Sequence, residues 1–154
     1  MIPDLNIFSV MIEKIFLDGC VLMDFFENRT GANYVESILA LGERKEISCQ
    51  TSSVLICTIA YLFEKYKIFP KKEISNVIAS LMENVTILPV NKNHIQSAVE
   101  KKAIDFEDNV QTACAEEMSD CIITDNKKHF KNSMIPVYTP KEFLAKIFPT
   151  SNIT

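Results

Sequence analysis

Short apolar runs alternate with longer stretches of helical periodicity along most of the chain. The apolar runs have the length of buried strands, and they cover residues 14–18, 46–50, 85–90, 121–124 and 134–139. The segments between them repeat their apolar side chains every three or four positions, which is typical of amphipathic helices. Helices are therefore expected at residues 21–29, 33–46, 51–66, 71–84, 92–103, 105–118 and 139–148.

The regular alternation of strand and helix predicts the fold class. Strands separated by helices indicate right-handed crossovers, so we expect a three-layer α/β/α domain with a central, mainly parallel sheet of about five strands. The domain is expected at residues 11–147, with an N-terminal extension at 1–10 and a C-terminal tail at 148–154. Ligands of such sheets bind at the carboxyl ends of the strands. The residues that directly follow the strands are therefore the first candidates for a site.

Composition narrows the class of protein. The chain has 154 residues, of which 47% are hydrophobic and 23% charged, and these values are ordinary for one globular domain. Its 3 glycines are too few and too scattered for a glycine-rich phosphate loop. The net charge of −4 argues against non-specific nucleic-acid binding but leaves room for a local basic patch.

The cysteines and the apolar segments indicate the compartment. The 5 cysteines are scattered and contain no C-x-x-C pair, which is typical of reduced thiols in a core. No apolar stretch approaches the ~18 residues of a membrane span. The first ten residues, "MIPDLNIFSV", lack the basic start and the long apolar core of a signal peptide. The sequence therefore predicts a cytoplasmic protein without a membrane segment.

Acidic and polar side chains fall where the strands end. Asp18 closes "KIFLD", Thr124 and Asn126 belong to "TDN" after the fourth strand, and Asp108 belongs to "DFED", which opens the helix before that strand. Carboxylates that share one site repel each other unless a cation lies between them. Oxygen ligands suit Mg²⁺ or Mn²⁺, and such a metal can orient water for attack on a phosphodiester. We therefore predict Asp18, Asp108 and Asn126 as metal ligands, with Thr124 supplying a hydroxyl group.

Each of these acidic positions also has a purely structural interpretation. Asp105 is a natural N-cap, and the acids beside it favour the positive end of a helix dipole. Asp18 would equally suit a cap of the following helix. Asp24 lies inside the first helix, where it either supports the site or pairs with a nearby Arg or Lys. Asp125 and Asn126 are also common turn residues.

The stretch "KKHFK" directly follows these acids. Its basic residues Lys127, Lys128 and Lys131 would hold an RNA backbone beside the metal, or they would simply form a solvated loop. His129 is a candidate proton donor, because the unperturbed pKa of histidine lies near ~6.5. The sequence alone does not assign it that role.

Two stretches resemble the PIN domain family of nucleases. "KIFLDGCVLMDFFENR" is similar to its opening strand and helix, and "DFEDNVQTACAEEMSDCIITDNKKHF" to its closing block of acidic helix, strand and T-x-D or T-x-N. The resemblance covers residues 11–147. It implies that Asp18 is the first metal-binding acid, that Asp108 is the acid of the late helix, and that Thr124 and Asn126 belong to the closing motif.

Many members of this family are ribonuclease toxins of type II toxin–antitoxin pairs, the VapC-like group. The resemblance therefore implies hydrolysis of RNA with Mg²⁺ or Mn²⁺. It further implies a small antitoxin protein as partner and a homodimer.

The chain departs from the family pattern in its acidic site. Thr58 stands where the middle helix usually carries a second acid, Gly19 and Cys20 replace the last two residues of D-T-N, and His129 stands where an acid is common. These departures leave a second interpretation open, a non-catalytic PIN protein that binds RNA or a protein. A third class, a phosphoaspartate hydrolase or a receiver, fits poorly. The first would need an Asp at Cys20, and the second an acidic pair before Asp18.

Overall fold

The sheet is entirely parallel in the computed structural model, which describes residues 13–102 and 104–149. Its strands are β1 (Lys14–Leu17), β2 (Ser48–Ser52), β3 (Val85–Leu88), β4 (Cys121–Ile123) and β5 (Val137–Tyr138). They lie in the order β3-β2-β1-β4-β5, and every neighbouring pair is parallel. The predicted fold class is confirmed. The predicted N-terminal extension, 1–10, and residues 150–154 of the predicted tail lie outside the described residues.

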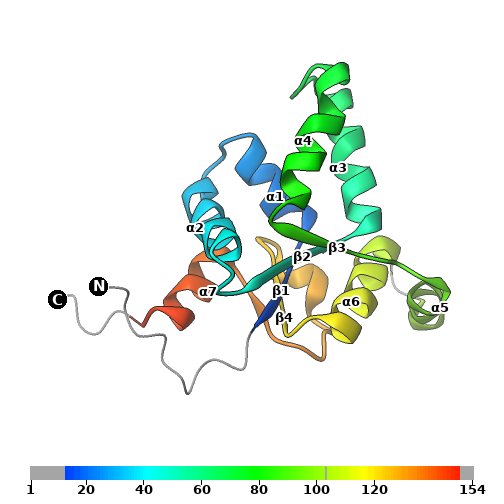
Figure 1. Ribbon diagram of the computed structural model, residues 1–154. Coiled ribbons are helices and arrows are strands. Elements are labelled where there is room, and N and C mark those ends of the chain that lie inside the picture. Colours follow the sequence, from blue (N-terminus) through cyan, green and yellow to red (C-terminus); the bar gives the residue numbers. More distant parts are fainter. Residues whose placement is uncertain (1–12, 103, 150–154) are drawn as a thin grey trace.

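Helices cover both faces of this sheet, as Figure 1 shows. The α-helices are α1 (Gly19–Phe26), α2 (Ala32–Glu43), α3 (Ser53–Lys65), α4 (Ile74–Met82), α5 (Lys92–Lys101), α6 (Phe106–Met118) and α7 (Pro140–Ile147). Two 3₁₀ turns, η2 (Lys71–Glu73) and η3 (Lys127–Phe130), lie before α4 and after β4. Helices α1, α2, α4 and α7 pack on one face, and α6 with η3 packs on the other. The architecture therefore has three layers.

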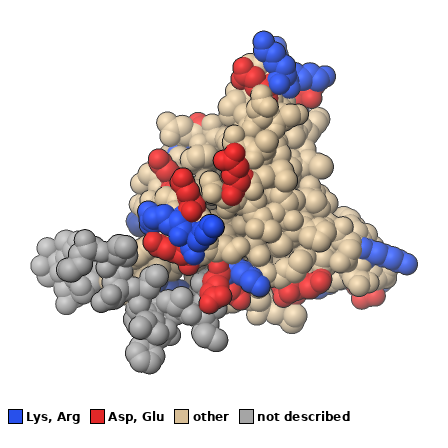
Figure 2. Space-filling view, in the orientation of Figure 1, with Lys and Arg blue, Asp and Glu red and all other residues tan. Residues whose placement is uncertain are grey.

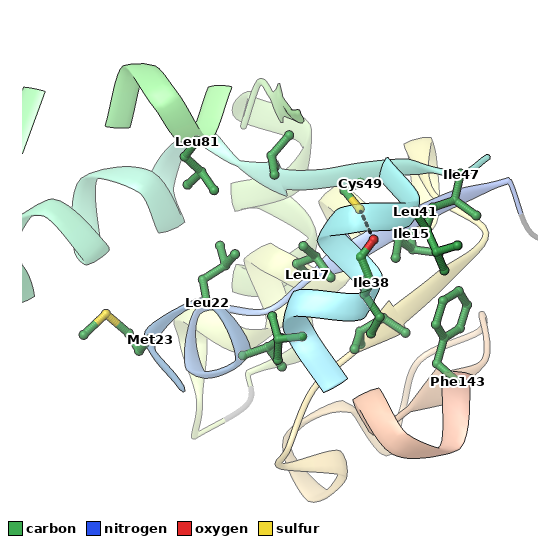
Figure 3. Close-up of a cluster of buried hydrophobic side chains, with 14 of the residues drawn as sticks. Ile15, Leu17, Leu22, Met23, Ile38, Leu41, Ile47, Cys49, Leu81 and Phe143 are labelled. Carbon is green, nitrogen blue, oxygen red and sulfur yellow. Dashed lines mark hydrogen bonds between the residues drawn. The ribbon is translucent and has the colours of Figure 1, made fainter. Parts of the chain in front are cut away.

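Alternating side chains of the central strand fill two cores. Ile15 and Leu17 of β1 belong to the larger cluster, and Phe16 between them points to the smaller one, as expected for the period of two in a strand. Figure 3 shows the larger cluster, in which Phe143 of α7 lies near Ile15. Cys114 of α6 belongs to the smaller cluster. These two cores fix β1, and with it the residue that follows β1, at the centre of the domain.

A close approach of α2 to β2 explains one glycine. A Cβ atom at Gly42 would lie 2.8 Å from the Sγ atom of Cys49, closer than such contacts occur. The Cys49 thiol donates a hydrogen bond to the carbonyl of Ile38 in the same helix (3.6 Å; Figure 3). Only a residue without a side chain lets the helix pack at this distance.

Several element boundaries differ from the sequence-based expectation, among them those of β2, β5 and α1. β2 begins and ends two residues later than expected, because Thr51 and Ser52 pair with Ile87 and Leu88 before the Ser52 hydroxyl caps α3. Capping residues at the end of this strand look like the start of a helix in sequence. β5 has 2 residues instead of the six expected. α1 begins at Gly19, immediately after β1.

Acidic and basic side chains are interspersed on the face drawn in Figure 2, and basic ones gather at the tip of the α3–α4 pair. The net charge of −4 thus does not produce one acidic face in this view. Within residues 13–102 and 104–149, no helix has the length and apolar character that crossing a bilayer requires.

Candidate metal centre at the carboxyl edge of the sheet

Asp18 lies at the carboxyl end of β1 and is only 8% exposed. Its Oδ1 atom accepts a hydrogen bond from the backbone N–H of Gly19 (2.8 Å), so Asp18 caps α1. Its Oδ2 atom accepts from the hydroxyl of Thr124 (2.8 Å) and from the thiol of Cys20 (3.2 Å). These donors satisfy a buried carboxylate that would otherwise be costly. The prediction that Asp18 caps the following helix is confirmed. The same residue also lies at the carboxyl edge of the sheet, so the cap is compatible with a role in a site.

Thr124 connects Asp18 to the closing motif. Its buried hydroxyl donates to Asp18 and accepts a hydrogen bond from the backbone N–H of Asn126 (3.0 Å). The Cys20 thiol lies 3.5 Å from the same hydroxyl. Burial, followed by the charge of Asp18, raises the pKa of Cys20 to about 12. Cys20 is therefore a neutral donor at neutral pH, which is the state that suits a thiol facing a carboxylate.

The first turn of α6 brings further carboxylates to the same place. Asp108 and Glu107 line one pocket with Asp18, and the pocket has a volume of about 350 Å³. Burial raises the pKa of Asp108, His129 opposes this shift, and the charges of Asp18, Asp105 and Glu107 reinforce it. The predicted pair Asp18 and Asp108 therefore faces one shared space, and the charge of Asp18 contributes to the raised pKa of Asp108.

His129 connects Asp108 to Asn126. Its Nδ1 atom lies 2.9 Å from Oδ2 of Asp108, and its Nε2 atom lies 2.9 Å from the amide nitrogen of Asn126. The Nδ1 side of the ring thus faces the Asp108 carboxylate, and the Nε2 side faces the Asn126 amide. The structure does not place the Asn126 side chain beside Asp18, where we expected it as a metal ligand. Its side chain contacts His129, and it is not among the described residues that line the Asp18 pocket.

Thr58 occupies the position on α3 where the resemblance led us to expect an acid. Its hydroxyl lies 3.1 Å from the carbonyl of Val54 and 3.4 Å from Oε1 of Glu107. Glu107 of α6 thus brings a carboxylate to within hydrogen-bond distance of this position. Sequence patterns do not predict this contact, because the two residues belong to different helices.

Asp24 and Asp125 form a second acidic pair next to Asp18. Burial raises the pKa of Asp125 to about 7, and a hydrogen bond to Asp24 and the charges of Asp24 and Asp18 contribute. Asp24 also lies 3.6 Å from Arg29, which pairs with Glu27 as well. Arg29 lines the pocket of Asp18. The expected pairing of Asp24 with a base is correct, but sequence reasoning missed Arg29 and took Asp125 for a turn residue.

Two further side chains, those of Asp105 and Lys127, make other contacts than we expected from the sequence. Asp105 stands at the N-cap position of α6, but its side chain makes no capping hydrogen bond. It offers an oxygen within 4.8 Å of ligand atoms of Asp108 and His129 instead. Lys127 donates to Glu142 (2.9 Å), and it is therefore partly neutralised.

The donor set of this edge fits a divalent cation. Carboxylates from β1 and α6 face one pocket, and burial and mutual repulsion raise the pKa of Asp108. A cation between them would lower this repulsion. Their oxygen atoms are the donors that Mg²⁺ and Mn²⁺ prefer, and these ions commonly use one or two protein carboxylates.

A parallel sheet with acids gathered at its carboxyl edge defines an α/β domain with a candidate metal centre. A family model described as PIN domain matches residues 14–128. The chain therefore belongs to the PIN domain family, as the resemblance predicted. It is 32% identical over 140 residues to Ribonuclease VapC1 of Aquifex aeolicus (strain VF5), a match that covers 87% of this chain and 95% of that protein.

Solved structures with this fold include toxin–antitoxin complexes. VapBC2 from Rickettsia felis, bound to a promoter DNA fragment, matches with a TM-score of 0.61 at 16% identity, covering 81% of this chain and 96% of that one. A toxin–antitoxin complex from Klebsiella pneumoniae matches with a TM-score of 0.58 at 19% identity, covering 82% and 97%. At these identities the matches establish the fold alone.

Proposed function

We propose that the chain is a metal-dependent endoribonuclease and the toxin of a type II toxin–antitoxin pair. The observation that carries this proposal is the shared pocket, in which Asp18 from β1 faces Asp108 and Glu107 from α6. The name of the relative, Ribonuclease VapC1, supports RNA as the substrate. A basic segment beside the pocket supports it too, since phosphate binding depends on local cations.

In this proposal Asp18 and Asp108 hold a Mg²⁺ or Mn²⁺ ion. The ion would supply charge stabilisation at the scissile phosphate and orient the attacking water. Thr124 and the Gly19 N–H keep the Asp18 oxygens in place. His129 does the same for Asp108, and Asn126 orients His129. Such supporting contacts commonly change metal affinity 10–100-fold when removed, as a rough guide.

Glu107 supplies the acid that is missing at Thr58. Its carboxylate lines the pocket and lies within hydrogen-bond distance of the Thr58 hydroxyl. The site then has three carboxylates, Asp18, Glu107 and Asp108, although the middle helix carries none at the family position. This arrangement favours an active enzyme over a degenerate one.

The partners follow from the same proposal. RNA is the substrate, and a small antitoxin protein is the partner, as the toxin–antitoxin complexes among the structural neighbours suggest. Lys128 and Lys131 remain candidates for RNA contacts, and Lys127 is a weaker one because it is paired with Glu142. We also propose a homodimer and a cytoplasmic location, which agrees with the free state of all five cysteines.

The second candidate is a PIN protein that binds RNA or a protein without cutting. Thr58, an uncharged residue at the family's acidic position, is the observation that favours it. This candidate and the nuclease predict opposite results for cleavage by the purified chain.

Cleavage by matched variants tests the proposal. Purified chain would be incubated with random-sequence single-stranded RNA and with bulk bacterial tRNA, in Mn²⁺ or in EDTA. Asp18→Asn and Asp108→Asn should abolish the metal-dependent cleavage, and Mn²⁺ calorimetry should show that both lose specific binding. Glu83→Gln is the control, because Glu83 is an exposed acid outside the Asp18 pocket. Equal cleavage by all four proteins would indicate a contaminating nuclease and overturn the assignment.

A further inference from the structure

A second pocket shares His129 with the pocket of Asp18. It has a volume of about 320 Å³, which is at the lower end of the rough range of 300–1,000 Å³ for ligand pockets. Lys101, Lys128, Lys131 and Asn132 line it, and His129 lines both this pocket and that of Asp18. We call it the lysine pocket. One strand of a polymer crossing His129 would therefore reach both pockets.

Three exposed lysines give this pocket its charge. Lys101 comes from the last turn of α5, and Lys128 and Lys131 come from η3 and the residue after it. Within the described part of the chain none of the three forms an ion pair, whereas Lys127 of the same turn is paired with Glu142. Three lysines without an ion-pair partner among the described residues therefore line one cavity, in a chain with a net charge of −4.

The neutral side chains of the lysine pocket are already engaged. The Thr112 hydroxyl donates to the carbonyl of Asp108 (2.7 Å), and the Ser133 hydroxyl donates to the carbonyl of Ile135 (2.8 Å). The Asn109 amide donates to the carbonyl of Asp105 (2.8 Å). These three groups fix the walls, so the donors left for a ligand are the ammonium groups and the amide of Asn132. Lysines recognise phosphate as point charges and carry little base information.

One acid borders the lysine pocket. Asp105 lines it, and its carboxylate lies within 4.8 Å of ligand atoms of Asp108 and His129. Asp105 therefore lines the lysine pocket and also lies near Asp108, and the three lysines outnumber it.

We propose that the lysine pocket binds a backbone phosphate of the RNA strand, next to the phosphate that enters the Asp18–Asp108 pocket. The proposal rests on the proposed ribonuclease function and extends it by a substrate subsite. It replaces Lys127 by Lys101 among the residues expected to contact RNA. The subsite positions the strand by contact with its backbone, because its charged donors are ammonium groups.

The salt dependence of RNA binding tests the subsite. The probe is a fluorescein-labelled random-sequence single-stranded RNA, followed by anisotropy in EDTA so that binding is measured without metal-dependent cleavage. The slope of log K against log [salt] should fall by roughly 0.7 in the triple variant Lys101→Gln, Lys128→Gln, Lys131→Gln, since one single-strand phosphate contact contributes roughly that amount. The triple Lys→Arg variant should keep the wild-type slope.

A charge-matched control uses Lys65→Gln, Lys72→Gln and Lys141→Gln, which are exposed lysines outside the lysine pocket. An unchanged slope in the pocket variant, or an equal fall in pocket and control variants, would overturn the subsite. Polyglutamate binding that matches RNA in affinity and is lost in the pocket variant would identify an acidic-peptide surface instead, and would also overturn it.

The outcome is separable from that of the ribonuclease proposal. A chain that binds RNA through these lysines but never cuts would refute the nuclease and leave the subsite standing. A chain that cuts through Asp18 and Asp108 with a salt slope indifferent to the lysines would refute the subsite alone.

Discussion

The two halves of the acidic site are held in different ways. On the strand side, Asp18 is buried and accepts hydrogen bonds from Gly19, Cys20 and Thr124. These bonds connect β1, α1 and β4, so this half of the site is also part of what holds the sheet edge together. Removing its charge or its acceptors disturbs the fold as well as the chemistry.

On the helix side, Asp105 and Glu107 are exposed and Asp108 is half-buried. His129 provides the one side-chain partner of the Asp108 carboxylate among the described residues. The raised pKa of Asp108 shows that its charge costs free energy in the folded chain. This half of the site gains from a cation, whereas the strand half is stable without one.

The largest expected effect separates the two halves directly. Asp18→Asn and Asp108→Asn should both remove a metal ligand, which is worth several kcal/mol of transition-state stabilisation, or roughly a thousandfold in rate. Their stabilities should differ. In Asp18→Asn, one carboxylate oxygen that accepts hydrogen bonds is replaced by an amide nitrogen, which cannot accept them. We therefore expect the free energy of unfolding to fall by about 1–3 kcal/mol.

Asp108→Asn should leave the melting temperature in EDTA unchanged or raise it, because the substitution removes a charge that burial and three neighbouring acids disfavour. Thermal unfolding of both variants, in EDTA and in Mn²⁺, measures this difference. Wild-type stability in Asp18→Asn, or equal losses in both variants, would contradict the comparison.

A smaller effect on metal binding and cleavage is expected from Glu107, whose carboxylate lies where α3 lacks the acid of the family pattern. Glu107→Gln should lower Mn²⁺ affinity and cleavage by roughly 10–100-fold, the effect typical of groups that support a metal site. Thr58→Glu in that background should restore part of the loss, because Thr58 lies within 3.4 Å of the lost carboxylate. Thr58→Glu alone should change cleavage little, since two adjacent carboxylates repel.

Calorimetry and cleavage rates of the single and double variants measure this coupling. A large gain in cleavage by Thr58→Glu alone would instead support the degenerate protein, with an acid missing from the wild-type site. Thr58→Gln in the Glu107→Gln background is the uncharged control.

The fold followed from the sequence because each local pattern agreed with the global arrangement. The alternation of short apolar runs with helical periodicity predicted the parallel sheet, but the strand ends were predicted less closely. β3 ends at Leu88, two residues earlier than expected. β2 ends two residues later than expected, since the capping residues Thr51 and Ser52 extend it. The two-residue β5 is too short for any periodicity to define it.

The site could be anticipated only as far as topology places residues. Asp18 and Asp108 face one pocket because both lie at the carboxyl edge of the sheet. The direction in which a side chain points is set by tertiary contacts, and for this reason the contact of Asn126 with His129 was not foreseen. The same reason applies to Arg29 and to the pairing of Asp125 with Asp24.

The smallest expected effect is the pH dependence of the Asp24–Asp125 pair. Because the pKa of Asp125 is raised from 3.8 to about 7 in the folded chain, its contribution to stability is complete below pH 3.8 and is lost as the pH rises through about 7. Asp125→Asn keeps a donor toward Asp24 and has no such loss. Its advantage over the wild type should therefore grow between about pH 4 and pH 7 and then stay constant.

The expected gain is at most ~1 kcal/mol, because Asp125 is exposed and solvent screens the pair. It corresponds to a rise in melting temperature of about 2–4 °C for a chain of this size. Melting curves of the wild type and Asp125→Asn across this range measure it, with Glu83→Gln as the matched loss of one exposed acid. A gain independent of pH would show that Asp125 is ionised throughout, and the acidic pair would then be held as two charges by Arg29 rather than by a shared proton.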